Sequence, residues 1–348
     1  MNFFSKKGEI DMRVFLFCCT LIILFYCDQP TKWNDEINKD IVLIKDMPFM
    51  HMAVWRNNKL FSIKIPNEMT LNDEYAVESD SVYEFLKDTT ITSGYNYKFI
   101  EANEQGTKVL YAKSIYRDVS AGSLYELDLE SKEYTLLIES SYNVSSAVYW
   151  HGDDSRLVYY RYGNPIGHNP GYYLYDKNTK QSELLFEHIA PCGPSEMLNG
   201  FDLHPNNNVL LIPAVQAPPL SNKSPKIIKY NINKKTIDTL SVNFDLSNRR
   251  IGLWLRYNSD ASRILYCNFP RGSFTSTTND DSEVGIIELP SQDRKILDVN
   301  TNSKDTYKSV QIAPNWSPDY KHIVYGSGPL SIEGARGRYS LYILKNVN

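Results

Sequence analysis

Two histidines are the best candidates for metal chemistry in this sequence. His151 and His204 each follow a strand-like run and precede Gly or Pro, so they hold similar places in successive repeats. A metal site needs three or four convergent ligands, and the six histidines are scattered along the chain. We predict no metal and no cofactor, and we keep His151 and His204 as weak candidates that a common axis could bring together.

Paired carboxylates occur at Asp153-Asp154 and Asp280-Asp281, within turn-rich stretches. Adjacent acids in a turn mostly accept hydrogen bonds from backbone amides, so a glycosidase pair is not expected. The sequence has no Gly-x-Ser-x-Gly, no phosphate-binding Gly-x-x-x-x-Gly-Lys and no His-Glu-x-x-His. These residues favour binding over catalysis, and no catalytic residue is predicted.

Aromatic and arginine side chains gather in the irregular segments between strand-like runs. Such side chains dominate binding surfaces, because they give large contact areas and forked hydrogen bonding. The candidate ligand-binding residues are Tyr116, Arg117, Tyr162, His168, Asn169, Arg271, Phe274, Arg336 and Arg338.

A repeat positions these segments. Five short β runs begin at Lys108, Arg156, Asn208, Arg263 and His322, each after a turn rich in Asn, Asp or Gly. A second β run follows each irregular segment, and several units add a polar turn and a third run. With the strand that leads into each turn, a unit has four strands, which is typical of a β-propeller blade. The predicted fold is all-β.

The clearest unit is Trp316-Ser-Pro-Asp319 and the strand after it. It resembles the blade motif of TolB-type propellers, in which Trp/Phe-Ser-Pro-Asp-Gly joins the innermost strand to the next one. The resemblance covers about residues 96–348 and implies a six-bladed ring with a role in envelope protein assemblies. The peptidases that share this propeller carry an α/β-hydrolase domain, which this sequence lacks.

Residues 32–95 are predicted to supply the sixth blade, from runs at Ile41–Ile44, Met52–Trp55 and Leu60–Ile65. Ser79–Lys87 is predicted as a short helix. Ring closure is expected to pair strands from the two ends of the chain. A seven-bladed ring is the open alternative.

The long irregular segments all join the second and third strands of their blades, so they are expected on one face of the ring. A two-residue to five-residue hairpin would suffice there, and insertions that accumulate on one face of a repeat array usually make the binding face.

The N-terminus is typical of an export signal. Lys6, Lys7 and Arg13 precede an apolar run from Val14 to Tyr26, and Cys27 closes the run. Leu24-Phe25-Tyr26-Cys27 resembles a lipobox, although Tyr26 stands where a small residue is usual. We predict a signal peptide over residues 1–26, lipidation of Cys27 and one propeller domain over 32–348; simple cleavage and a retained anchor are the alternatives.

The net charge of −4 gives no electrostatic basis for binding nucleic acid. We therefore predict an exported, lipid-anchored protein of the bacterial cell envelope, periplasmic or at the outer membrane. It would dock an envelope protein or a cell-surface glycan on its loop face without catalysis. The alternative is a polysaccharide lyase or a glycoside-active enzyme with a site on the propeller axis.

Overall fold

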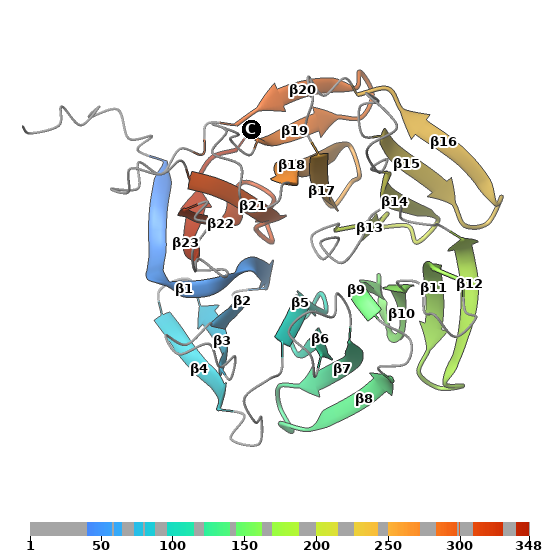
Figure 1. Cartoon of the computed structure of the whole chain (residues 1–348), viewed down its shortest axis with the longest axis horizontal. Coiled ribbons are helices and arrows are strands. Elements are labelled where there is room, and N and C mark those ends of the chain that lie inside the picture. Colours follow the sequence, from blue (N-terminus) through green and yellow to red (C-terminus); the bar gives the residue numbers. More distant parts are fainter. Residues whose placement is uncertain are drawn as a thin grey trace, which may run out of the picture. The chain divides into compact units, whose positions relative to one another are not determined.

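The chain folds into a ring of small antiparallel sheets (Figure 1). The computed structural model describes residues 40–57, 59–64, 73–78, 81–87, 96–114, 122–139, 144–161, 169–187, 200–214, 226–242, 250–271, 283–297, 299, 309–329 and 339–347. Contacts divide the chain into residues 1–37 and the unit Asn38–Asn348, which holds every described strand. The fold is an all-β propeller, as predicted.

Four sheets have four strands each, ordered so that the first strand of each lies nearest the ring centre (Figure 1). The first is β5 (Asn96–Ala102), β6 (Lys108–Ser114), β7 (Ser123–Asp128) and β8 (Tyr134–Ile138). The second is β9 (Val144–Trp150), β10 (Asp153–Arg161), β11 (Gly171–Asp176) and β12 (Gln181–Glu187). The third is β13 (Asp202–Leu203), β14 (Val209–Ala214), β15 (Lys226–Asn231) and β16 (Thr236–Leu240). The fourth is β17 (Arg250–Tyr257), β18 (Arg263–Arg271), β19 (Glu283–Glu288) and β20 (Asp293–Ile296).

The fifth sheet has seven strands and closes the ring. Its order is β21 (Ser309–Trp316), β22 (Ile323–Pro329), β23 (Tyr339–Leu344), β1 (Ile41–Arg56), β2 (Lys59–Lys64), β3 (Asp73–Glu78) and β4 (Ser81–Lys87). β1 pairs with β23 through its first half and with β2 through its second half, with register shifts between the two pairings. The expected pairing of the two chain ends is confirmed.

Two predictions about this region are wrong. The ring has five blades and not six separate ones, because the 16-residue strand β1 continues without a break from its pairing with β23 to its pairing with β2. The segment predicted as a helix over Ser79–Lys87 contains strand β4, which pairs antiparallel with β3 from Glu78↔Ser81 to Asp73↔Lys87. Pairing with β3 therefore outweighs the local capping pattern that favoured a helix.

The core lies between neighbouring sheets, because both faces of the middle strands are covered. Leu157, Val158 and Tyr159 are consecutive in β10 and all three are buried, as expected for a strand enclosed on both faces. On the neighbouring sheet, Phe201 meets Tyr172 edge to face with ring centroids 4.9 Å apart. The outermost strands β8, β12, β16 and β20 are mostly exposed.

Tyrosine pairs repeat within the sheets and account for part of the high tyrosine content. The directly paired residues Tyr111 and Tyr125 stack with ring centroids 5.5 Å apart. Tyr159 stacks on Tyr173 and Tyr325 on Tyr342 in the same way. Such cross-strand aromatic pairs stabilise a sheet beyond the area they bury.

Four inner strands end in the same turn, and its first residue is Asn103, His204, Asn258 or Ser317. In each turn this residue donates its N–H to a carbonyl five residues on, and its own carbonyl accepts the N–H of the fourth turn residue. The fourth residue has positive φ and is Gly106, Asn207, Ala261 or Tyr320. The turn fixes the direction in which each inner strand reaches the axis.

No helix among the described residues has the length and apolar character needed to cross a membrane.

Candidate functional site at the ring axis

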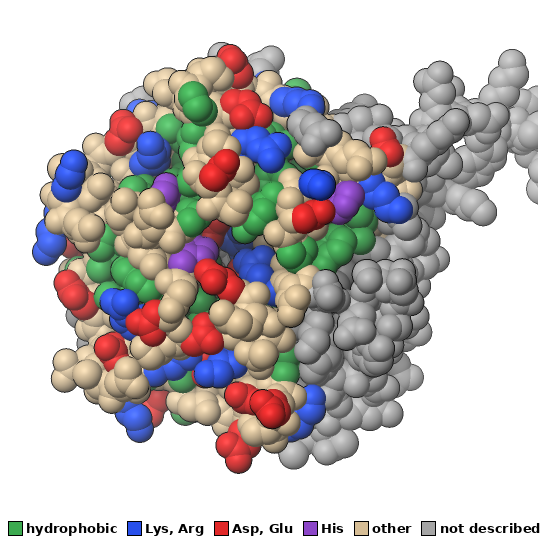
Figure 2. Space-filling view, turned by 180° about the vertical axis from the view of Figure 1, so that it is seen from behind, with side chains coloured by type: hydrophobic (Ala, Val, Ile, Leu, Met, Phe, Trp, Pro, Cys, Tyr) green, Lys and Arg blue, Asp and Glu red, His purple; other side chains and the backbone are tan. Residues whose placement is uncertain are grey.

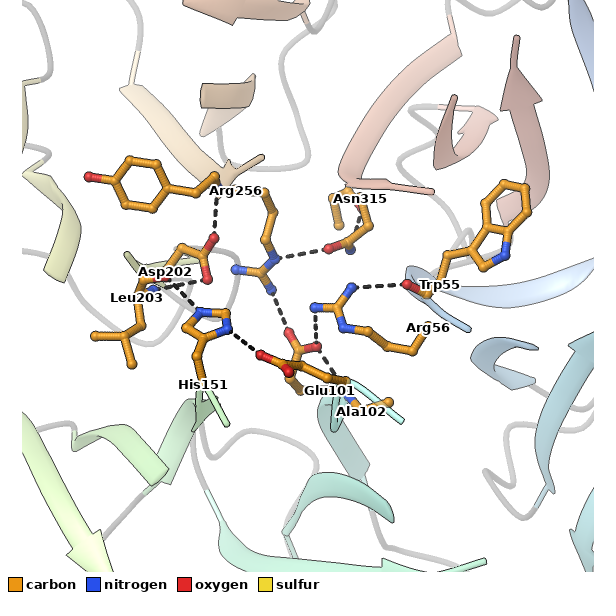
Figure 3. Close-up of polar contacts among 12 residues, drawn as sticks. Trp55, Arg56, Glu101, Ala102, His151, Asp202, Leu203, Arg256 and Asn315 are labelled. Atoms are coloured by element: carbon orange, nitrogen blue, oxygen red, sulfur yellow. Dashed lines mark hydrogen bonds and ion pairs between the residues drawn. The ribbon is translucent and has the colours of Figure 1, made fainter. Parts of the chain in front are cut away.

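Polar side chains from five inner strands meet at the centre of the ring (Figure 3). They are Arg56 of β1, Glu101 of β5, Asp202 of β13, Arg256 of β17 and Asn315 of β21. Each lies at or next to the end of its strand, beside the turn that leads to the second strand. Four of them, all except Arg56, stand two residues before the first residue of the shared turn. We call these five residues the axial cluster.

Strand geometry explains the convergence. Successive side chains point to opposite sides of a strand. In the four strands that end in the shared turn, the next residue is Ala102, Leu203, Tyr257 or Trp316, and all four are buried. Because side chains alternate along the strand, the polar residue before each buried one faces the axis, where five strand ends lie close together.

Glu101 is the centre of the cluster. Its Oε1 accepts a hydrogen bond from Arg56 Nη2 at 2.9 Å, and its Oε2 accepts one from Arg256 Nη2 at 3.2 Å. The Ala102 N–H also donates to Oε1 at 3.1 Å. The Glu101 side chain is only 3% exposed and that of Arg256 only 6%. Charges this deeply buried are tolerated only when they are paired and hydrogen-bonded.

Arg256 connects the inner strands to one another. Its Nε donates to Asn315 Oδ1 at 2.9 Å, and its Nη1 donates to the Phe201 carbonyl at 2.6 Å. The guanidinium also lies over the Trp254 ring, 4.4 Å from the centroid. The Arg256 side chain of β17 therefore contacts β5, β21 and Phe201, the residue that precedes β13. These contacts fix the relative positions of four inner strand ends.

Asp202 accepts hydrogen bonds from two backbone N–H groups. Its Oδ1 accepts the Leu203 N–H at 2.9 Å, and its Oδ2 accepts the Tyr257 N–H of β17 at 2.7 Å. Burial raises the pKa of the Asp202 carboxyl, and the nearby charges of Arg256 and His151 offset part of that rise. A carboxyl held by two strands with a raised pKa is a feature found in functional sites.

His151 bridges three neighbouring turns at the rim of the cluster. Its Nδ1 lies 2.8 Å from Glu104 Oε1 and its Nε2 lies 3.0 Å from the Leu203 carbonyl. Both partners can only accept, so both contacts are hydrogen bonds only when both ring nitrogens carry protons. The Asn207 side chain accepts the His151 N–H and donates to the His151 carbonyl, each at 2.9 Å.

His204 stays within its own turn, where its Nδ1 accepts the Asn206 N–H at 3.0 Å. Its ring meets Tyr257 edge to face at 5.3 Å, and burial lowers the pKa of the imidazole. Over the part of the chain that the structure describes, no three His, Cys, Asp or Glu side chains are grouped to hold a metal ion. Among the described residues, His151 and His204 therefore do not belong to one set of metal ligands.

Figure 2 shows a hollow near the ring centre on the face seen from behind. Lys or Arg side chains lie inside it, and histidine and acidic side chains surround it. The charged residues of the axial cluster and the rim residues His151 and Glu104 are of these kinds.

Two of the nine predicted binding residues are described, and both lie toward the strand ends opposite the axial cluster. Arg271 ends β18 and pairs with Arg250 at the start of β17, whereas Arg256 lies near the end of β17. Asn169 is exposed, and its carbonyl accepts the Tyr173 hydroxyl at 2.7 Å. The other candidates lie outside the described residues, as does the lipidation candidate Cys27: Tyr116, Arg117, Tyr162, His168, Phe274, Arg336 and Arg338. Whether the nine predicted residues form one surface therefore stays a prediction.

The axial cluster was missed, although the sequence carries a signal for it. Glu101, Asp202, Arg256 and Asn315 stand at one repeat position, two residues before the turn, and each is followed by an apolar or aromatic residue. A single charged residue near a strand end is usually solvent-exposed, so each one alone predicts nothing. The signal is that the same position is polar in four repeats.

The comparisons with known proteins support the fold alone. No protein-family model matches the chain, and no curated protein matches it. Among solved structures, a putative TolB from Agrobacterium tumefaciens is similar with a TM-score of 0.53 at 12% identity, over 85% of this chain and 90% of that one.

Two further structures have TM-scores of 0.50. TolB from Acinetobacter baumannii is 14% identical over 86% of this chain and 65% of that chain. Oligogalacturonate lyase from Vibrio parahaemolyticus is 15% identical over 83% of this chain and 74% of that chain. At these identities the likeness establishes a β-propeller, the fold that the strand pairing shows.

The first prediction concerns the buried ion pair. We expect Glu101→Gln to lower the free energy of unfolding by about 3–5 kcal/mol, because Arg256 would stay buried without a negative partner. Adding Arg256→Met should recover part of that loss. Urea denaturation measures both changes. The control is Asp153→Asn, which breaks the more exposed contact with Arg156 and should cost about 1 kcal/mol or less. Equal losses in the two single variants would contradict a buried pair at the axis.

The second prediction concerns pH. Because the pKa of Asp202 is raised in the folded chain, the folded state binds this proton more tightly than the unfolded state does. The group therefore stabilises the fold below its unfolded pKa of about 3.9, and this contribution is lost as the pH rises through the folded pKa. Relative to Asp202→Asn, the free energy of unfolding of the wild-type protein should fall as the pH rises from the unfolded to the folded pKa. At higher pH the difference between the two proteins should stay constant. Urea midpoints measured across the range test this, and a rise in relative stability would show that the pKa is not raised.

Proposed function

We propose that this protein works by binding, and that a protein or cell-surface glycan docks on the face that carries its long connections. The connections between the second and third strands of a sheet include residues 115–122 and 272–282. The connections from one sheet to the next include residues 188–201 and 297–308. The first-to-second and third-to-fourth connections are much shorter, as in the hairpins after β9 and β3. Because the strands pair antiparallel, the strand ends that these connections join lie on one face of the ring.

This one-sided distribution is the observation that carries the proposal. A rigid scaffold that holds long connections on one face is the usual arrangement of binding loops. The axial cluster supports it, because it ties the inner strand ends together and so fixes the ring. The residues that we propose for contact remain Tyr116, Arg117, Tyr162, His168, Asn169, Arg271, Phe274, Arg336 and Arg338.

We further propose that the protein resides in the bacterial cell envelope, held by a lipid on Cys27 after removal of residues 1–26. The charged start and short apolar run before Cys27 support export. The likeness of the Trp316–Asp319 turn to the TolB-type motif supports an envelope role. A Cys27→Ser variant of the full chain should then leave the membrane fraction.

Affinity capture from solubilised membranes tests the docking face. We expect the full chain to recover a specific partner, and Arg336→Ala with Arg338→Ala to reduce that recovery at least tenfold, because paired arginines are frequent interface hot spots. The control is Arg156→Ala, which removes a partly exposed arginine at the opposite strand ends. If the double variant recovers every partner as well as the wild type does, the docking face is wrongly placed.

A further inference from the structure

Strand β8 forms the outer edge of its sheet. It pairs with β7 on one side and with no other described strand on the other side (Figure 1). The outer side of an edge strand offers backbone N–H and C=O groups with which another extended chain can pair. Folded proteins commonly block such an edge with a charged side chain in the strand. The other outer strands of this protein show where that charge belongs.

Four outer strands follow the same hairpin, so their positions can be compared directly. Each hairpin contains one residue of positive φ: Lys132, Lys180, Lys235 or Gln292. The third residue after it lies in the outer strand, and in each sheet it pairs with the corresponding residue of the third strand. This outer-strand position is exposed in all four sheets and is occupied by Thr135 in β8, Glu183 in β12, Asp238 in β16 and Lys295 in β20.

Strand β8 therefore lacks the charge that three other sheets carry at this position. Its five residues, Tyr134–Ile138, are all uncharged. Each of the other outer strands β4, β12, β16 and β20 contains at least one charged residue. Tyr134 is 41% exposed and Leu136 is 48% exposed. An uncharged edge strand with exposed apolar side chains favours the addition of another strand.

The side chains beside the edge favour an apolar ligand. Leu136 pairs with Tyr125, which stacks on Tyr111 with ring centroids 5.5 Å apart. Tyr134 meets Tyr111 edge to face at 6.2 Å. A strand added next to β8 would continue this row of cross-strand apolar neighbours and cover Leu136. Because side chains alternate along a strand, the ligand needs apolar residues at every second position.

Acidic residues stand at both ends of the edge. Glu133 immediately precedes β8 and Glu139 immediately follows it, and both are exposed. The hairpin before β8 adds Glu130 and Lys132, which carry opposite charges. Opposite charges on neighbouring strands stabilise their pairing. The edge therefore suits an extended segment with a basic residue at each end.

A second copy of this chain is a poor occupant of the same edge. Glu133 lies three residues before Leu136, the middle residue of β8, and Glu139 lies three residues after it. Two antiparallel β8 strands in full overlap would place Glu133 of each copy opposite Glu139 of the other, and parallel strands in register would place each glutamate beside its counterpart. Like charges directly opposite each other destabilise a sheet. The charges therefore favour a different polypeptide.

We propose that β8 binds an extended segment of another polypeptide as an additional strand of its sheet. The segment has apolar residues at alternate positions and a lysine or arginine at each end. Main-chain hydrogen bonds supply affinity in this mode of recognition, and the side chains supply specificity. The site lies on an outer strand and not on the connections proposed for docking, so it is a second binding surface that does not depend on them.

Fluorescence anisotropy with the labelled peptide Lys-Val-Thr-Val-Thr-Val-Lys tests the site on the full chain. We expect this peptide to bind. The same peptide with Glu at both ends should bind roughly tenfold more weakly or worse, because its ends would face Glu133 and Glu139. A peptide N-methylated at every central residue cannot donate main-chain hydrogen bonds, so its affinity should also be roughly tenfold lower or worse.

Variants of the edge separate strand addition from non-specific contact. Thr135→Lys introduces the kind of charge that β20 carries and should lower affinity for the Lys-ended peptide roughly tenfold or more. Thr135→Val keeps an uncharged β-branched residue and should bind as the wild type does. Thr239→Lys is the matched control, because Thr239 is an exposed threonine on the outer strand β16, and it should also bind normally. Glu133→Lys combined with Glu139→Lys should reverse the preference, so that the Glu-ended peptide binds better.

The proposal is overturned if the wild type does not bind the Lys-ended peptide or binds the N-methylated peptide equally well. Unchanged affinity in Thr135→Lys, or an equal loss in Thr239→Lys, would also overturn it. Sedimentation of the wild type tests the other occupant, since a dimer that Thr135→Lys dissociates would assign the edge to a second copy. Thermal unfolding checks that each variant is folded. Membrane capture through the loop face can succeed or fail independently of these results.

Discussion

The ring depends on one buried carboxylate that two guanidinium groups share. Glu101 neutralises part of the charge of Arg56 and Arg256, and Arg256 extends the contact to Phe201 and Asn315. Removing charge from water is costly unless the partners are well placed. The cluster therefore tolerates only one arrangement of the inner strand ends. It specifies this arrangement as well as stabilising it.

The rest of the propeller follows from how the sheets surround that centre. Each small sheet buries both faces of its middle strands against its neighbours, and the tyrosine pairs fill the same place in three sheets. Strand β1 joins the first and last parts of the chain, so the ring has no free sheet end at its closure. The short turns between first and second strands then gather at one face of the ring.

Sequence alone predicted the architecture because the signal repeats. The β runs at Lys108, Asn208 and Arg263 follow the same kind of turn, and each lies in the second strand of a sheet. The continuity of β1 was not predictable, since a polar stretch between two apolar runs is typical of a turn. The helix at Ser79–Lys87 failed for a similar reason, because pairing with β3 outweighed a local capping pattern.

The site was harder to predict, because its residues are brought together by ring closure and not by local sequence. Glu101 and Arg256 are separated by 155 positions, and a charged residue near a strand end normally faces water. Only the repeated polar position could have indicated a shared axis.

Amide hydrogen exchange at Tyr257 tests most directly whether the axis holds the inner strands together. Its N–H donates to Asp202 across two strands at 2.7 Å. We predict that it exchanges only through global unfolding, at a rate typical of the most protected core amides. The amide of Asn178, in an exposed outer turn, should exchange far faster. Equal rates at Tyr257 and Asn178 would contradict the account.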